Sequence, residues 1–527
     1  MSDKQKSIVS GMTVLSISGF ICKAVGALYR IPLAWIIGES GLGMYQLVFP
    51  TYNVLLTISS AGIPVAISRL VSYSLAKDDP RNAKRIFQIA MSLLMCLGSI
   101  SMLLMLVFSP ALARRVGDPQ TSMGFMAIAP ALLLVCMMSA FRGFLQGQQN
   151  MTPTAVSQLI EQVGKVVIIL PMAYFGMRIS VAHAAAFVLL GNTIAEGVAL
   201  LFIFIVFRRN KKVIRQRPQN RDLPMQSRRF LIRQILSFSI PIALSSCVIP
   251  LAGFVDSGML LNRLKDTGMA LEDARVLYGR YSGYVISLIN VPTALSIAIA
   301  MSLVPAISSA IARGDRRAVQ KQCNMGIRYA FLIGLPCSVG MSLLSYRLLA
   351  MMYPMLAPEG LQMTAELLSM SSLTIVLFTV TQSTEGILQG MRKQRIPMYS
   401  LIAGVVVKIF LNYTLVGMPA VNIYGAPMAS IACYTIAMVP NLCFAYRHAR
   451  IRMNVMATIG KPLLTTVFMG ILLYFGNRYL PRGSLWTFLL ILVGIASYAA
   501  FALWVGAMTR EDVMPFIRRF RRQGGNS

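Results

Sequence analysis

The sequence holds little of the side-chain chemistry that most enzymes use. Only 2 of its 527 residues are histidine and 18 are aspartate or glutamate, against 49 lysines and arginines. Two histidines leave little with which to build a metal site or a catalytic triad. The 8 cysteines form no C-x-x-C pair, and no G-x-x-x-x-G-K-[ST] phosphate loop is present. These absences argue against an enzyme, a metal site and an ATP-driven pump, and we expect no cofactor.

The chain also lacks any long polar segment. The longest stretch between apolar runs is residues 208–232, which is too short to form a soluble catalytic domain. The composition is 56% hydrophobic and 13% charged, with a mean hydropathy of +0.66. The charges gather in short clusters between apolar runs of about 20 residues or more, enough to cross about 30 Å of hydrocarbon. We therefore predict an all-α polytopic membrane protein.

We expect about fourteen transmembrane helices. Their approximate ranges are 7–38, 44–75, 86–109, 121–147, 153–176, 181–207, 233–262, 281–312, 322–346, 362–390, 397–418, 424–446, 458–480 and 484–508. The first run follows Lys4 and Lys6 as a signal peptide would. It continues to Ile37 without a small-residue cleavage site, so we expect it to be retained as a helix.

The distribution of basic residues predicts the orientation. With the N-terminus in the cytoplasm, the inside segments hold 31 lysines and arginines and the outside loops hold 10. Cytoplasmic loops carry such an excess, so both termini are expected to be cytoplasmic in a bacterial plasma membrane. The net charge of +31 then reflects this bias and contact with anionic membrane lipids. Nucleic-acid binding is not the expected explanation.

Part of the chain is repeated. RGFLQGQQNMTP (Arg142–Pro153) and EGILQGMRKQRIP (Glu385–Pro397) share G-x-x-Q-G at an offset of 243. The same offset relates Lys165 to Lys408. A second similar pair is PVAISRLVSYSLAKDDPR (Pro64–Arg81) and VPAISSAIARGDRR (Val304–Arg317). Because matching segments have the same predicted orientation, the repeat is a parallel one, which is typical of transporters with two lobes.

The repeat predicts the domain organisation, with two pseudo-symmetric six-helix lobes followed by two C-terminal helices. The expected parts are residues 1–207 (N-lobe, helices 1–6), 208–232 (basic cytoplasmic linker), 233–450 (C-lobe, helices 7–12), and 451–527 (helices 13 and 14 with a basic cytoplasmic tail).

Two cations interrupt the first apolar run. Lys23 and Arg30 are seven residues apart, which is two helical turns, so they share one face. A cation facing lipid costs roughly 3 kcal/mol, whereas a cation facing a wet cavity avoids that cost. Such a strip suits a pyrophosphate. The alternatives are that either residue snorkels to the interface or pairs with Glu39.

Together these features resemble a known family. The helix count, the stretch SGFICKAVGALYRIPLAWIIGESGLGMYQLVFP, and the FLQGQQNMTP and ILQGMRKQRIP pair resemble the multidrug/oligosaccharidyl-lipid/polysaccharide exporter superfamily. Within it the chain is most similar to stage V sporulation protein B-like polysaccharide biosynthesis proteins, relatives of the lipid II flippase MurJ. The resemblance implies that the chain flips an undecaprenyl-pyrophosphate-linked sugar to the outer leaflet, driven by membrane potential or an ion gradient. It also implies that Lys23 and Arg30 contact this substrate.

The resemblance also implies an ion-coupling site. Sodium-binding members use a carboxylate on helix 7 and an Asn/Asp pair on helix 11. Here the corresponding residues are Asp256, Lys408 and Asn412, so a lysine replaces one ligand and could pair with Asp256 in place of sodium. The alternative is a fixed structural ion pair.

Other charges within predicted helices have more than one interpretation. Glu161 and Lys165 are one turn apart; they could take part in ion coupling or simply neutralise each other. Glu196 has no evident partner in the sequence. The repeat offset relates Arg142 to Glu385, so these opposite charges could form a gate between the lobes, or each could face its own cytoplasmic loop.

Two further function classes stay open. One is a multidrug and toxin extrusion-type antiporter of small molecules, which shares the architecture but would favour an acidic cavity for organic cations. The other is a scaffold for wall or spore-coat assembly, which would not need opposed charges inside the membrane. We expect a monomer that handles a lipid-linked oligosaccharide, with cell-wall synthesis proteins as possible partners.

Overall fold

The computed structural model describes residues 18–19, 21–22, 25–26, 28–215, 225–449 and 454–508. Within these ranges, twelve helices are long and apolar enough to cross a membrane, or thirteen if one bent helix pair counts as a span. No strand occurs in them. Lys23 and part of the first predicted span lie outside the described residues. The predicted all-α membrane fold is confirmed.

The helix bounds follow the predicted spans closely. The first elements are α2 (Arg30–Ser60), α3 (Ile63–Ala76), α4 (Pro80–Val107), α5 (Ser109–Arg115), η1 (Pro119–Thr121), α6 (Ser122–Gly147), α7 (Thr152–Met177), α8 (Val181–Arg215), α9 (Arg228–Ser246), α10 (Val248–Asp266) and α11 (Leu271–Gly279). The later ones are η2 (Arg280–Val285), α12 (Ile286–Ala312), α13 (Arg316–Leu343), α14 (Ser345–Met352), α15 (Pro358–Ser371), α16 (Leu373–Gly390), α17 (Arg395–Val416), η3 (Asn422–Tyr424), α18 (Gly425–Ala449), η4 (Met456–Gly460), α19 (Lys461–Tyr479) and α20 (Ser484–Trp504).

The first, second and seventh predicted spans differ from the observed helices. The break expected between the first two spans, at residues 39–43, is helical: α2 continues through it, with a kink at Gly38, where φ is +66°. Glycine tolerates this left-handed conformation, so the chain turns without a loop. The seventh predicted span is broken into α9 and α10, which are bent by 49°.

The chain forms two compact units. Unit 1 comprises the described parts of Met1–Gly283 and Asn412–Ile423, and unit 2 comprises those of Tyr284–Leu411 and Tyr424–Ser527. The predicted lobe boundary at residues 208–232 is not tested by this division and stays a prediction.

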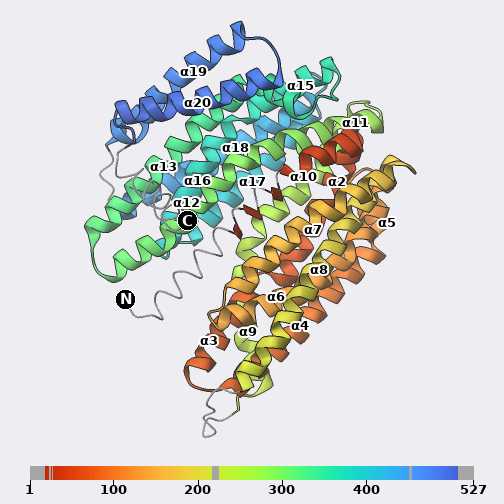
Figure 1. Cartoon of the computed structure of the whole chain (residues 1–527), viewed down its shortest axis with the longest axis vertical. Coiled ribbons are helices and arrows are strands. Elements are labelled where there is room, and N and C mark those ends of the chain that lie inside the picture. The colour runs from red at the N-terminus through yellow and green to blue at the C-terminus, as the bar shows by residue number, and fades with distance from the viewer. Residues whose placement is uncertain are drawn as a thin grey trace, which may run out of the picture. The chain divides into compact units, whose positions relative to one another are not determined.

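Each unit is built around one central helix with equivalent neighbours. In unit 1, α6 packs against α3, α4 and α8; in unit 2, α16 packs against α12, α13 and α18 (Figure 1). A Cβ at Gly143 would lie 2.8 Å from the Pro64 carbonyl oxygen, and one at Gly386 would lie 2.7 Å from that of Ala300. The repeated motif therefore keeps glycine where two helix backbones touch, and the packing agrees with pseudo-symmetric lobes.

Aromatic side chains fill the interior of unit 1 at one end of α4, α6 and α8. The ring of Phe87 lies 5.5 Å from Phe141, 5.0 Å from Phe144 and 4.7 Å from Phe207, measured between centroids. Such ring pairs contribute packing contacts worth about 0.5–1.5 kcal/mol each. In unit 2, α19 and α20 run side by side and pack on α13 (Figure 1).

Candidate functional site

Four charged side chains meet inside unit 1. Arg142 lies on α6, Glu161 and Lys165 lie on α7, and Glu196 lies on α8. Their side chains are 15%, 14%, 13% and 4% exposed, respectively. We call these four residues the buried charge network.

Lys165 is the centre of the buried charge network. Its Nζ lies 2.8 Å from Glu161 Oε1 and 3.1 Å from Glu196 Oε1. Arg142 approaches the other side of Glu161, with Nη2 3.2 Å from Oε2, and its Nε donates to Ser157 Oγ at 2.9 Å. Two cations thus face two carboxylates. Such pairing offsets the large cost of burying an isolated charge, which amounts to several kcal/mol per ion.

Helix geometry explains why these residues meet. Positions 161 and 165 are one turn apart on α7 and share a face, and α7 packs along α8, which brings Glu196 to the same place. Mutual neutralisation of Glu161 and Lys165 is therefore part of the observed arrangement, while their role in ion coupling stays a prediction. Glu196 is the member that the sequence left without a partner, because its contact depends on how two helices pack.

Gly26 and Cys22, which precede α2 in the chain, lie close to the buried charge network. A Cβ at Gly26 would lie 3.2 Å from Gln162 Oε1, next to Glu161 on α7. Cys22 lies within electrostatic reach of the network, as does the buried side chain of Tyr52 on α2. The predicted strip position Lys23 follows Cys22 in the chain but lies outside the described residues.

Two buried polar atoms on α8 have no hydrogen-bond partner among the described residues. They are Glu196 Oε2 and Asn192 Nδ2, one helical turn apart on the same face. Buried polar groups are nearly always satisfied by protein, water or a ligand. The face of α8 that carries them is therefore suited to contact water or a polar cargo.

Arg30 begins α2 beside two tyrosines. Its guanidinium lies close to the hydroxyl group of Tyr45, which is 3.3 Å from that of Tyr29. Glu39, the alternative partner considered from the sequence, binds Arg280 instead, with Oε2 2.8 Å from Arg280 Nε. Arg30 is half-buried in unit 1, which is compatible with the predicted substrate contact but does not test it.

Three of the predicted ion-coupling residues, Asp256, Lys408 and Asn412, lie outside the buried charge network. Two of them, Asp256 and Asn412, are in contact in unit 1. Asn412 Nδ2 donates to Asp256 Oδ1 at 2.9 Å, and Asn412 is fully buried. Lys408 lies one turn earlier on α17, so it shares a helix face with Asn412. The proposed replacement of sodium by the Lys408 ammonium stays a prediction.

The two residues of the predicted gate each have partners within their own unit. Arg142 belongs to the buried charge network, and Glu385 accepts from Gln382 Nε2 at 3.2 Å and Gln389 Nε2 at 2.8 Å. A gate contact would require Arg142 to exchange Glu161 for Glu385 during the transport cycle.

We predict that cysteines at positions 142 and 385, in a background without the native 8 cysteines, become crosslinked in one transport state and that the crosslink blocks transport reversibly. Reversing both charges should restore part of the activity that either single reversal loses, because the attraction is recovered. Crosslinking yield and transport in proteoliposomes measure this. Absence of any crosslink, with silent single reversals, would contradict the gate.

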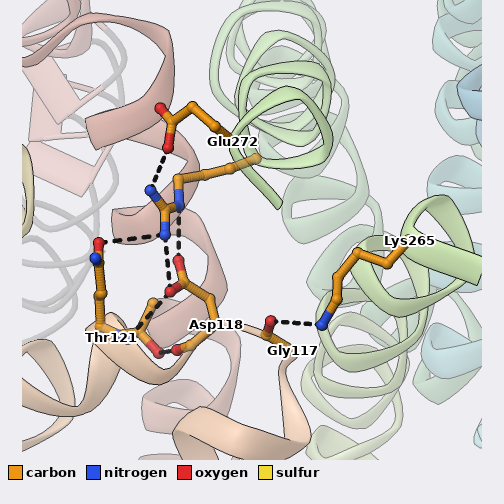
Figure 2. Close-up of polar contacts among 7 residues, drawn as sticks. Gly117, Asp118, Thr121, Lys265 and Glu272 are labelled. Carbon is orange, nitrogen blue, oxygen red and sulfur yellow. Dashed lines mark hydrogen bonds and ion pairs between the residues drawn. The ribbon is translucent and has the colours of Figure 1, made fainter. Parts of the chain in front are cut away.

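A second set of polar contacts joins the segment before α6 to α11, and sequence reasoning missed it (Figure 2). Arg275 binds Asp118 through two contacts, Nε to Oδ2 at 2.8 Å and Nη2 to Oδ1 at 2.9 Å. It also contacts Glu272 and, at 3.3 Å, Gln120. We call Asp118, Gln120, Glu272 and Arg275 the Arg275 cluster. Asp118 is fully buried and Arg275 is 4% exposed, so the fork-to-carboxylate pair is shielded from water.

Gly117, the residue before Asp118, makes two close contacts with α10. Lys265 Nζ donates to the Gly117 carbonyl oxygen at 3.0 Å (Figure 2). Gly117 has φ +86°, and a Cβ there would lie 2.4 Å from Asn262 Oδ1. The Gly-Asp-Pro sequence at 117–119 signals a turn, but nothing in it reveals a partner 157 residues later in the chain.

The site chemistry does not favour a bound metal ion. In the described ranges no group of three or more His, Cys, Asp or Glu side chains is positioned to hold one. The two carboxylates of the buried charge network are already neutralised by Arg142 and Lys165. This arrangement can hold charged side chains within a membrane-spanning unit, and it allows Arg142 and Lys165 to exchange their ion-pair partners.

Comparison with family descriptions gives two matches. Residues 8–311 match the family described as "Polysaccharide biosynthesis protein". Residues 241–414 match the family described as "MatE". The first match covers more than half of the 527 residues.

Similar proteins and structures point to the same group. Stage V sporulation protein B of Bacillus subtilis (strain 168) is 26% identical over 428 residues, covering 81% of each chain. The lipid II flippase MurJ of the same organism is 26% identical over 460 residues, covering 84% of this chain and 83% of that protein. A solved structure of lipid II flippase MurJ in an inward closed conformation superposes with a TM-score of 0.67 at 13% identity, covering 93% of this chain and 98% of the other. That likeness shows a shared fold.

Proposed function

Because the chain belongs to the polysaccharide biosynthesis protein family, we propose that it carries a lipid-linked sugar across the membrane. The cargo is an undecaprenyl-pyrophosphate-linked sugar, either lipid II or a related polysaccharide precursor. It moves from the inner to the outer leaflet by alternating access, driven by membrane potential or an ion gradient. No covalent chemistry is required of the protein, so it acts as a transporter rather than an enzyme.

The observation that carries this proposal is the buried charge network inside unit 1. A sugar pyrophosphate must cross about 30 Å of hydrocarbon, so it needs a polar path with cations along it. Arg142 and Lys165 offer charge-assisted donors, and a pyrophosphate could compete with Glu161 for both of them. The similarity to a lipid II flippase over more than four-fifths of both chains supports the same cargo class.

The predicted cationic strip, Lys23 and Arg30, should bind the pyrophosphate. We predict that Arg30→Ala lowers the flipping rate by about 10-fold to 100-fold, because a hydrogen bond to a charged group is worth about 1.5–3 kcal/mol. Lys23→Arg should be tolerated better than Lys23→Ala, since it keeps the charge. Flipping is followed with a fluorescent lipid-linked precursor in proteoliposomes, as protection from a membrane-impermeant quencher.

Expression and thermal stability of the same variants provide the control. A loss of flipping with normal stability assigns the effect to cargo contact. Full activity of both alanine variants would remove the strip from the mechanism.

Coupling is proposed to depend on Asp256, Lys408 and Asn412. If the Lys408 ammonium takes the place of sodium, flipping should not depend on sodium at fixed pH and membrane potential. Asp256→Asn and Lys408→Met should each impair flipping, and the double variant should be less impaired than the sum of the single effects, because the two groups act as a pair. A steep sodium requirement in proteoliposomes would contradict this assignment.

Orientation and context follow from the same proposal. In a bacterial plasma membrane the excess of lysine and arginine on one side places both termini in the cytoplasm. We further propose a monomer that works with cell-wall synthesis proteins. In this orientation the Arg275 cluster lies on the outer side, where cargo is released.

A second candidate is a multidrug and toxin extrusion-type antiporter, favoured by the MatE match over residues 241–414. Paired assays separate the two: flipping of the lipid-linked precursor and efflux of a fluorescent organic cation from the same proteoliposomes. Cation efflux without flipping would favour the antiporter.

A further inference from the structure

A basic pocket lies between the first turns of α4 and α9 in unit 1. Its volume is about 930 Å³, near the upper end of the range for small-molecule sites, about 300–1,000 Å³. Four cationic side chains line it, and no acidic side chain does: Arg81, Lys84, Arg85 and Arg228. We call this cavity the α4–α9 pocket.

These cations are poorly placed for the helices that carry them. A helix N-terminus favours negative charge. Asp79 caps α4, with its Oδ1 accepting from the Asn82 backbone N–H at 3.0 Å, whereas α9 is capped by the neutral Ser227, and neither helix has an acidic residue in its first turn. Among the described residues, Lys84, Arg85 and Arg228 take part in no ion pair. An anion bound between these cations would offset their repulsion for one another and for the positive ends of the two helix dipoles.

The side chains that line the α4–α9 pocket change from cationic to mainly apolar along its length. Beyond the cations its lining is uncharged and mainly apolar, with Phe87, Ile89, Met91 and Leu93 of α4 and Ile232 of α9, and with Gln88 and Ser92 as the polar members. From Arg81 to Leu93 the helix rises by about 18 Å. A free phosphate would use only the cationic end, whereas a lipid would place its headgroup there and acyl chains along the apolar part.

The repeat supplies an internal comparison. The α12–α13 turn corresponds to the α3–α4 turn, and α13 begins with Arg316 as α4 begins with a basic turn. The pocket there measures about 360 Å³, and its lining includes both Arg316 and Asp315, so its charges cancel. A basic loop therefore does not by itself produce a pocket like the one between α4 and α9.

We propose that the α4–α9 pocket binds one anionic phospholipid, such as phosphatidylglycerol or cardiolipin, as a resident ligand of unit 1. Basic pockets between transmembrane helices on the cytoplasmic side bind such headgroups. The bound lipid would contact both α4 and the start of α9. The same two segments are joined by a hydrogen bond from the backbone N–H of Gln226 to Asn82 Oδ1 at 3.1 Å. The site is separate from the buried charge network and does not depend on which cargo is transported.

The test compares two triple variants that remove equal charge. Lys84→Gln/Arg85→Gln/Arg228→Gln alters the α4–α9 pocket, and Arg316→Gln/Arg317→Gln/Lys321→Gln alters the corresponding turn of unit 2. Each protein is purified from membranes containing phosphatidylglycerol, cardiolipin and phosphatidylcholine. Native mass spectrometry then counts the phospholipids retained, and thermal unfolding is measured with and without added phosphatidylglycerol.

The wild type and the unit 2 variant should retain an anionic phospholipid. The pocket variant should bind it about 100-fold more weakly, because each cation near an anionic lipid contributes about a fivefold factor. Equal retention by both variants would overturn the proposal, as would retention of phosphatidylcholine in the same amount. Equal protection by glycerol 3-phosphate or inorganic phosphate would assign the pocket to a soluble anion and reject the lipid.

Discussion

Lys165→Met is expected to abolish transport and to lower the free energy of unfolding by about 3–5 kcal/mol. The substitution keeps the apolar stem but removes the ammonium group that lies between Glu161 and Glu196. Two carboxylates are then left buried within one membrane-spanning unit, with only Arg142 to offset them. Breaking a buried ion pair in this way costs more than the pair contributes, because the remaining charge has no water to solvate it.

Two further variants separate stability from transport. Lys165→Met/Glu196→Gln removes one charge of each sign, so it should recover much of the stability but not the transport. Lys321→Met removes an exposed lysine of α13. It should leave the free energy of unfolding within about 0.5 kcal/mol, and the transport rate within about twofold, of the wild-type values. Thermal and denaturant unfolding in detergent give the stability. Normal stability of Lys165→Met would contradict the buried charge network as described.

Asp118→Ala is expected to have the second largest effect, about 3–5 kcal/mol of lost stability. Arg275, which is 4% exposed, would lose both contacts to Asp118 and keep only its ion pair with Glu272, a side chain that is 60% exposed. Asp118→Asn/Arg275→Gln should cost less, since no buried charge remains. Asp266→Asn is the matched control, because it breaks an ion pair whose carboxylate is 56% exposed, and such pairs are worth about 0–1 kcal/mol.

The same cluster should also affect transport. If α11 must separate from the segment before α6 to release cargo, a reversible thiol crosslink between cysteines at 118 and 275 should stop flipping. Reduction should restore it, and either single cysteine should show no crosslinker effect. Unchanged flipping by the crosslinked protein would mean that this part of unit 1 does not open in the cycle.

Much of the fold could be predicted from the sequence because the membrane imposes simple length and charge rules. Apolar runs such as 121–147 and 153–176 match α6 and α7 within one residue at each end. The G-x-x-Q-G repeat predicted pseudo-symmetric lobes, and in the structure Gly143 and Gly386 both lie at close helix contacts. The helical turn at Gly38 was missed, because glycine permits both a loop and a kink.

The candidate site could be predicted only within single helices. Glu161 and Lys165 were recognisable because one helical turn separates them. Glu196 and the Arg275–Asp118 pair were not, since their contacts join segments far apart in the chain and depend on tertiary packing. Charges inside helices identify candidates, and packing decides their partners.

The most direct test of the proposed function is flipping of an undecaprenyl-pyrophosphate-linked sugar by the purified protein in proteoliposomes. The wild type should move the fluorescent precursor to the opposite leaflet, while Lys165→Met/Glu196→Gln, selected for its retained stability, should not. Movement of precursor at the same rate in protein-free liposomes and in both proteins would contradict the account.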